Sequence, residues 1–123
     1  MSWNFVSDRP IYTQLLEQIR LRIISGQYPP GGKLNSVREL AAEASVNPNT
    51  MQKALSELER SGLIYSQRTS GRFITEDESM IQQLKEEIAV KQVDDFLRAM
   101  KELGLEPEET LELLQKEIKE MKQ

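Results

Sequence analysis

The chain has 123 residues, of which 38% are hydrophobic and 29% charged, enough for one ordinary domain or for a small domain with an appendage. It has no cysteine and no histidine, so it lacks thiolate chemistry, the two commonest transition-metal ligands and the commonest general base. We therefore expect no enzyme: no catalytic residue, no cofactor and no metal site.

The sequence also carries no stretch near the ~20 consecutive apolar residues of a membrane span. Its first residues, MSWNFVSDRP, lack the basic and then apolar run of a signal peptide. We expect a cytoplasmic protein that makes no membrane contact.

The net charge of −4 is divided unevenly along the chain. Residues 1–75 carry nine Lys or Arg against six Asp or Glu, which gives +3, and residues 76–123 carry seven against fourteen, which gives −7. Only the basic part is suited to approach phosphates. We therefore expect two functional zones, a domain over residues 1–75 and a second over residues 76–123.

The first zone opens with the aromatic stretch Trp3–Val6, which is either a short strand or a tether. A helix is then predicted over residues 10–25, because Ile11, Leu15, Ile19 and Ile23 recur at steps of four. The run of two prolines and two glycines at residues 29–32 predicts a turn.

Two shorter helices follow. Ser36 and Glu39 have the spacing of a capping box, which predicts a helix start at Ser36. Asn47 as N-cap and Pro48 at the first helical position predict the next start, and Gly62 ends that helix. Two short helices behind a longer one indicate a helix-turn-helix.

The residues after the third predicted helix indicate a hairpin. Leu63–Tyr65 and Arg72–Ile74 are β-prone and flank a polar loop that contains Gly71. A hairpin at this place is the wing of a winged helix. The predicted fold is therefore mainly α with a small β-hairpin, a winged helix-turn-helix followed by a helical tail.

The acidic tail is expected to form two amphipathic helices, one ending before Gly104 and one beginning at Pro107. Two such helices leave a large apolar face without a third element to cover it, so a second copy of the chain is the expected cover. The dimerisation residues predicted on this stripe are Ile81, Leu84, Ile88, Val93, Leu97, Met100, Leu103, Leu111, Leu114 and Ile118.

The outward face of the third helix carries Asn49, Thr50, Gln52 and Lys53. Gln and Asn suit adenine, Lys suits guanine or phosphate, and Thr suits a phosphate or a thymine methyl. The same residues also fit an ordinary solvated helix face, and composition alone does not decide between the two. Double-stranded DNA is the partner that this face indicates.

Three arginines outside that helix are further candidates. Arg38 lies at the start of the second helix, where a helix-turn-helix meets the DNA backbone. Arg68 and Arg72 lie in and beside the wing tip, within reach of a groove or of phosphates. For each of them the alternative is an ordinary surface arginine.

The runs PIYTQL, IISGQYPPGGKL, NSVREL, VNPNTMQKAL, LERSGLIYSQ and SGRFI, in this order and spacing, resemble the amino-terminal domain of GntR-family bacterial transcription regulators. The short tail looks like that of the YtrA subfamily, in which the tail dimerises the protein and no large effector domain follows. The resemblance implies DNA contacts from Arg38, from Asn47, Asn49, Thr50 and Gln52, and from the wing near Arg68 and Gly71.

The resemblance also implies a repressor that binds a palindromic operator as a homodimer and that controls transporter genes. Whether a small-molecule effector exists is left open, as is activation in place of repression. The alternative function is a winged-helix adaptor for protein interactions that has no DNA binding. Asn35 departs from the family by replacing a proline, which should loosen the start of the second helix.

Overall fold

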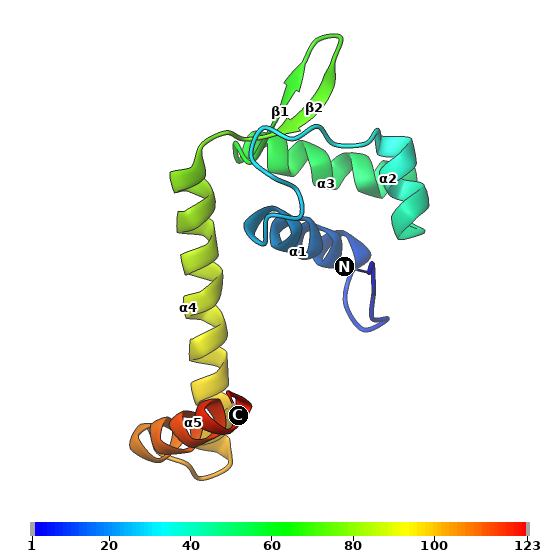
Figure 1. Cartoon of the computed structure of the whole chain (residues 1–123). Coiled ribbons are helices and arrows are strands. Elements are labelled where there is room, and N and C mark those ends of the chain that lie inside the picture. Colours follow the sequence, from blue (N-terminus) through cyan, green and yellow to red (C-terminus); the bar gives the residue numbers. More distant parts are fainter. Residues whose placement is uncertain (1, 123) are drawn as a thin grey trace. The chain divides into compact units, whose positions relative to one another are not determined.

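The computed structural model describes residues 2–122, which form two compact units that divide between Leu84 and Lys85. The elements in chain order are α1 (Ile11–Ile24), α2 (Val37–Ala44), α3 (Pro48–Arg60), β1 (Ile64–Gln67), β2 (Gly71–Ile74), α4 (Glu78–Glu102) and α5 (Pro107–Met121). The order confirms the predicted winged helix followed by two helices (Figure 1).

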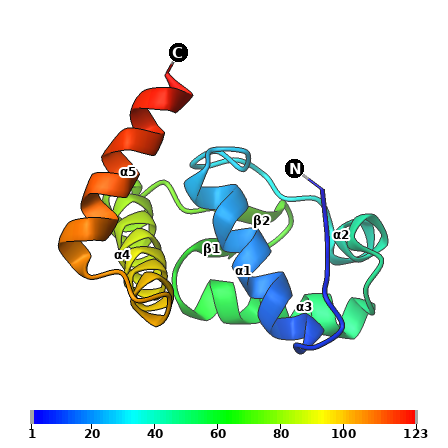
Figure 2. The same cartoon turned by 90° about the horizontal axis from the view of Figure 1, so that it is seen from below.

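The core of the first unit lies between α1 and α3. The four-residue repeat of α1 brings Leu15, Ile19 and Ile23 onto one buried side. They belong to the same cluster as the fully buried Met51 and Leu58 of α3. Figure 2 shows α1 lying across α3, an arrangement that leaves the opposite side of α3 uncovered by this helix.

The turn from α2 to α3 is short and locally specified. Ser45 ends α2 in the left-handed conformation, with φ at 56°, and the amide of Val46 then donates to the carbonyl of Ala41. Asn47 begins α3 by accepting the amide of Asn49 at 2.7 Å, and Pro48 occupies the first helical position. The predicted start of α3 is thus confirmed in detail.

The two strands pair as an antiparallel hairpin that projects from the three helices (Figure 1). Tyr65 and Phe73 are register partners, and their rings stack at 5.7 Å between centroids. On its other side β2 is bonded by the loop before α2, since Leu34 donates to the carbonyl of Arg72 and Ile74 donates to that of Gly32. The loop therefore holds the base of the hairpin in place.

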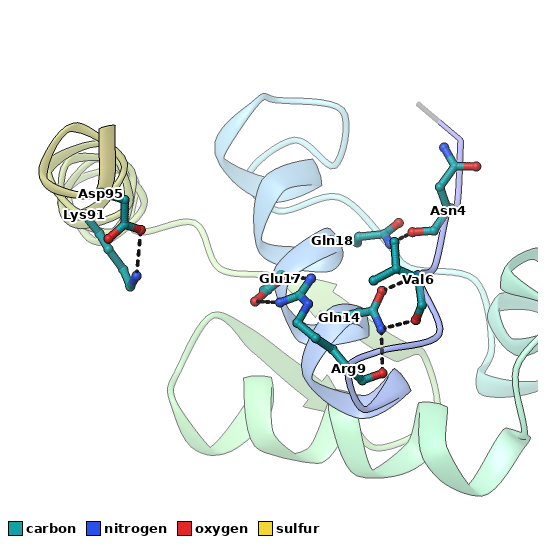
Figure 3. Close-up of polar contacts among 8 residues, drawn as sticks. All are labelled: Asn4, Val6, Arg9, Gln14, Glu17, Gln18, Lys91 and Asp95. Carbon is teal, nitrogen blue, oxygen red and sulfur yellow. Dashed lines mark hydrogen bonds and ion pairs between the residues drawn. The ribbon is translucent and has the colours of Figure 1, made fainter. Parts of the chain in front are cut away.

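The stretch before α1 is a tether along that helix and not a strand. Gln14 both accepts the amide of Val6 at 2.8 Å and donates to its carbonyl at 2.9 Å, and Gln18 donates to the carbonyl of Asn4 (Figure 3). One turn further along, the guanidinium of Arg22 stacks on the ring of Trp3, with 3.5 Å to the centroid. Side chains at every fourth position of α1 thus fasten the tether.

The start of α4 is built into the first unit. Ile81 is buried in the core cluster, and Met80 and Leu84 pack against it. Gly62, with φ at 89°, lies against Met80, because a Cβ there would be 3.1 Å from the methyl carbon of that side chain. The end of α3 is therefore in close contact with the beginning of α4.

The second unit has almost no core of its own. Thr110 is the single buried side chain in its described residues. Helix α5 turns back across the C-terminal end of α4 (Figure 1), yet the two helices make little close backbone contact. Ion pairs such as Lys91–Asp95, at 3.0 Å, line the exposed surface of α4 (Figure 3). None of the helices in residues 2–122 has the length and apolar character required to cross a lipid bilayer.

Candidate nucleic-acid interface

The outward side of α3 forms a shallow groove of about 660 Å³. Its lining includes Thr50, Gln52 and Lys53 from α3, the three neighbouring candidates of the sequence analysis. Gln52 donates to the hydroxyl of Ser56 one turn further on, at 3.2 Å. The groove thus presents an amide, a hydroxyl and an ammonium group together, the mixture that base edges and phosphates require.

Asn47 and Asn49 lie at the start of α3, outside the lining of this groove. Asn47 acts as the N-cap, so its side-chain oxygen is engaged with the amide of Asn49. Asn49 itself is exposed. The amides of the first turn and the positive end of the helix dipole make this position favourable for a phosphate.

Arg38 is exposed in the first turn of α2. A cation is unfavourable at this end of a helix, because the dipole is positive there. The turn is nevertheless well formed, since Ser36 and Glu39 complete the capping box at 3.0 and 3.2 Å. The amide and the hydroxyl of Ser36 hold the pKa of Glu39 below its ordinary value. A phosphate bound beside Arg38 would offset the repulsion between this cation and the positive end of the helix dipole.

A side-chain hydrogen bond also joins the loop before α2 to the second turn of that helix. The side-chain amide of Asn35 donates to the carboxylate of Glu43 at 2.8 Å. The residue that stands where relatives have a proline thus supplies a hydrogen bond at this point. This bond restrains the turn that we expected to be looser.

A cleft of about 900 Å³ separates the first turn of α2 from the wing. Three cations line it, Lys33 from the preceding loop, Arg38 from α2 and Arg72 from β2, against the single carboxylate of Glu39. Gly71 and the residues of the wing turn close its other side. An excess of positive charge in a concave site favours an anionic partner.

The wing candidates differ in their surroundings. Arg68 is exposed in the turn between the strands and makes no ion pair within the described part of the chain. Gly71 has φ at 103°, a conformation that residues with side chains rarely adopt. Arg72 is partly buried, and its Nε donates to Glu59 of α3 at 2.9 Å.

The apolar stripe of the tail falls into two groups. Ile81 and Leu84 pack into the first unit, and Ile88 is half-buried. Further along, the side chains are mostly exposed, from 37% for Leu97 to 72% for Leu103. The exposed or half-buried members predicted to dimerise are Val93, Leu97, Met100, Leu103, Leu111, Leu114 and Ile118.

Three residues of these surfaces were missed by the sequence analysis. Tyr12 from α1 lines the groove of α3, Lys33 lines the cleft beside the wing, and Glu59 binds the wing. Tyr12 lies more than a helix away in sequence from the other residues of the groove, so no local spacing connects them. Lys33 lies five residues before Arg38, but its place beside the wing depends on the fold. Glu59 could have been suspected, since it is a carboxylate one turn before a hairpin that contains arginine.

A helix-turn-helix with an exposed polar recognition helix, a basic cleft and a wing defines a winged-helix DNA-binding protein. The family model described as "Bacterial regulatory proteins, gntR family" matches residues 11–74. The chain belongs to the GntR family of transcriptional regulators, and its first unit carries the DNA-binding domain of that family.

Relatives and solved structures agree with this assignment. The chain is 43% identical over 91% of its length to the HTH-type transcriptional regulator YhcF of Bacillus subtilis, of which 93% is covered. It is 46% identical over 58% of its length to the HTH-type transcriptional repressor YtrA of the same organism, of which 55% is covered. A GntR family transcriptional regulator from Listeria monocytogenes superimposes with a TM-score of 0.84 at 40% identity, over 91% of this chain and 98% of that one.

A further structure contains DNA. The DNA-binding domain of AraR in complex with operator ORX1 matches 61% of this chain and 93% of that chain, at 30% identity and a TM-score of 0.52. A domain similar to the winged helix of this chain has thus been solved in complex with an operator.

Proposed function

We propose that this regulator is a repressor that binds a palindromic operator as a homodimer and obstructs transcription. The observation that carries the proposal is the side-by-side exposure of Thr50, Gln52 and Lys53 in one groove on α3. A recognition helix in the major groove needs polar side chains on the face that points away from its own core. This is the arrangement that α3 offers.

In this proposal the DNA contacts divide by chemistry. Gln52 and Asn49 read base edges, with Thr50 beside them, while Lys53 supplies charge to a phosphate. Asn47 and the amides at the head of α3 meet the backbone. Arg38 binds a second phosphate through the cleft, and the wing contributes Arg68 at its tip with Gly71 beside it, while Arg72, predicted as a further contact, is paired with Glu59. Residues 1–75 are the proposed DNA-binding domain.

The proposed dimer uses residues 76–123. The support is the lack of a core in residues 85–122, where Leu111 is 55% exposed and Ile118 43% exposed within an amphipathic helix. Exposed apolar side chains in such numbers mark an interaction surface, because monomers of this size seldom leave them in water. A twofold dimer brings two recognition helices to successive major grooves, roughly 34 Å apart.

Relatives support repression as the outcome. YtrA and NagR of Bacillus subtilis are named transcriptional repressors, and NagR is 33% identical over 87% of this chain. The resemblance to the YtrA subfamily makes transporter genes the proposed targets. An effector, if the protein uses one, has to act by changing the spacing of the two recognition helices.

A DNA titration against salt tests this function. Binding of the full-length protein to the DNA upstream of its own gene, and to a scrambled duplex, is followed by fluorescence anisotropy from 50 to 300 mM salt, roughly the range in which phosphate contacts lose affinity steeply. A repressor should prefer the upstream DNA and show a steep negative slope of log affinity against log salt. Absence of binding to either duplex, at any salt concentration, would instead indicate the adaptor.

A further inference from the structure

The carboxylate of Glu59 joins both strands of the wing to α3. One of its oxygens, Oε1, accepts the hydroxyl of Ser66 at 2.6 Å and the Nε of Arg72 at 2.9 Å. Ser66 lies on β1 and Arg72 on β2, and the two are register partners in the hairpin. A single atom of the recognition helix therefore receives one donor from each strand at the same level of the wing.

This contact is one of the links that hold the wing against the recognition helix. The bonds from the loop before α2 hold the other edge of β2 through backbone atoms. Among the described residues, the hydrogen bonds of Glu59 are the side-chain bonds that link α3 to the hairpin. The hydroxyl of Ser66 and the guanidinium of Arg72 hold the pKa of Glu59 below its ordinary value, so the carboxylate is charged at neutral pH.

The same contact changes the charge that the wing presents. Arg72 is 22% exposed in its side chain and is paired with Glu59, whereas Arg68 is exposed at the tip. A cation that is already paired releases fewer counterions from DNA than an unpaired one. The wing thus has one arginine held by the protein and one directed to the solvent.

We propose that Glu59 is a positioning residue of the DNA interface, which fixes the wing against α3 and withholds Arg72 from phosphate so that the wing engages DNA through Arg68. The inference rests on the proposed function, because it assumes that the wing meets DNA. It adds a residue that touches no DNA itself. Its effect is on specificity: a fixed wing favours the operator, and a withheld arginine weakens binding to random sequences.

A double-mutant cycle between Glu59 and Arg68 tests the proposal in the full-length protein. The variants are Glu59→Gln, Arg68→Ala and both together, measured by anisotropy on the upstream duplex and on a scrambled duplex over a salt series. In the wild type, Arg68→Ala should weaken binding to the upstream duplex about tenfold, as expected for a lost arginine contact. In the Glu59→Gln background the same change should cost less than about threefold, because the wing is no longer fixed.

The salt series gives the second measurement. Glu59→Gln should strengthen binding to the scrambled duplex and steepen its salt slope by about one unit, since Arg72 becomes available to a phosphate. Glu59→Asp keeps the charge with a shorter reach. This variant should leave the salt slope unchanged but should still lower the cost of Arg68→Ala. The result separates the effect of the wing's position on binding from the effect of its charge.

Glu17→Gln is the matched control. Glu17 lies on α1 and pairs with Arg9 at 2.9 Å, away from the wing and outside the lining of the groove on α3. It makes the same change in charge, yet the cost of Arg68→Ala should stay at about tenfold in that background. Melting curves establish that each variant is folded at the temperature of the titrations.

Two results would overturn the inference. One is an equal cost of Arg68→Ala with and without the Glu59 carboxylate, which would make the two residues independent. The other is a wild type that binds the upstream duplex with a steep salt slope but loses nothing with Arg68→Ala, which would leave the repressor function in place without a role for the wing. A protein that binds neither duplex would contradict the proposed function itself.

Discussion

Gln52 and Lys53 are sequence neighbours on α3, and both line its groove, but the proposed function gives them different tasks on DNA. An amide has a donor and an acceptor at fixed positions and can match one base edge, whereas an ammonium group attracts any phosphate. The hydrogen bond to Ser56 restrains Gln52 before DNA arrives, which lowers the entropy lost on binding. Specificity and affinity are therefore expected to respond to different substitutions.

Gln52→Ala should cost ~1–3 kcal/mol on the operator and little on random DNA, because it removes a base contact. Lys53→Ala should weaken binding to both duplexes and reduce the salt slope by about one unit, because it removes a phosphate contact. Anisotropy titrations on the two duplexes distinguish these outcomes. Equal losses for Gln52→Ala on operator and random DNA would place its side chain on a phosphate and contradict the assigned role.

At the level of single residues, the sequence indicates the chemical type of each side chain more readily than the residues that surround it. Arg68 and Arg72 are both arginines of the wing, and nothing in their spacing separates them. The fold does, because Arg72 lies opposite Ser66 in the register and both reach Glu59. The contact between Glu59 and Arg72 joins residues thirteen positions apart and depends on the hairpin register. The sequence pattern predicts the ends of the strands, and the register only through them.

Among the secondary-structure elements, the helix starts were the best predicted, because their signals are local. The capping box of α2, the Asn47 cap of α3 and the prolines of α3 and α5 identified the starts of these helices within a residue. The apolar stripe of α4 was less well understood. The step of five between Ile88 and Val93 rotates the stripe, so that Val93 lies roughly 120° around the helix from Ile81. One helix thus serves two separate apolar surfaces, and the stripe alone suggested a single one.

The capping box of α2 should contribute measurably to stability. Ser36→Ala removes the hydroxyl that accepts the amide of Glu39, and loss of such a cap costs about 1 kcal/mol. Chemical denaturation of the full chain at neutral pH measures the difference. Ser7→Ala is the control, since Ser7 is exposed and lies outside every helix, and its effect should stay within about 0.5 kcal/mol. A loss no larger for Ser36→Ala than for Ser7→Ala would mean that the box adds nothing to the folded state.

For the whole molecule, the uneven distribution of charge agrees with the different functions proposed for its two parts. The basic part, residues 1–75 at +3, contains the groove and the cleft, and the acidic part, residues 76–123 at −7, contains the exposed apolar helices. An acidic tail is repelled by DNA, so it is poorly suited to contact with the operator. The sequence alone does not give the area of the proposed dimer contact. That area depends on how far α4 and α5 cover each other's apolar side chains, and these two helices make little close backbone contact.

The proposed dimer is a property of the whole molecule that substitutions in the tail should abolish. Leu97→Lys in α4 and Ile118→Lys in α5 each place a charge in the proposed interface, and burial of an unpaired charge there is costly. Sedimentation equilibrium at micromolar concentration should show a dimer for the wild type and a monomer for both variants. Glu112→Gln raises the net charge equally on the opposite side of α5, and it should remain dimeric. Operator affinity should fall about a hundredfold or more for the monomers, because the two DNA-binding domains no longer bind as one unit. Variants that remain dimeric, or monomers that keep full operator affinity, would contradict a dimer built from the tail.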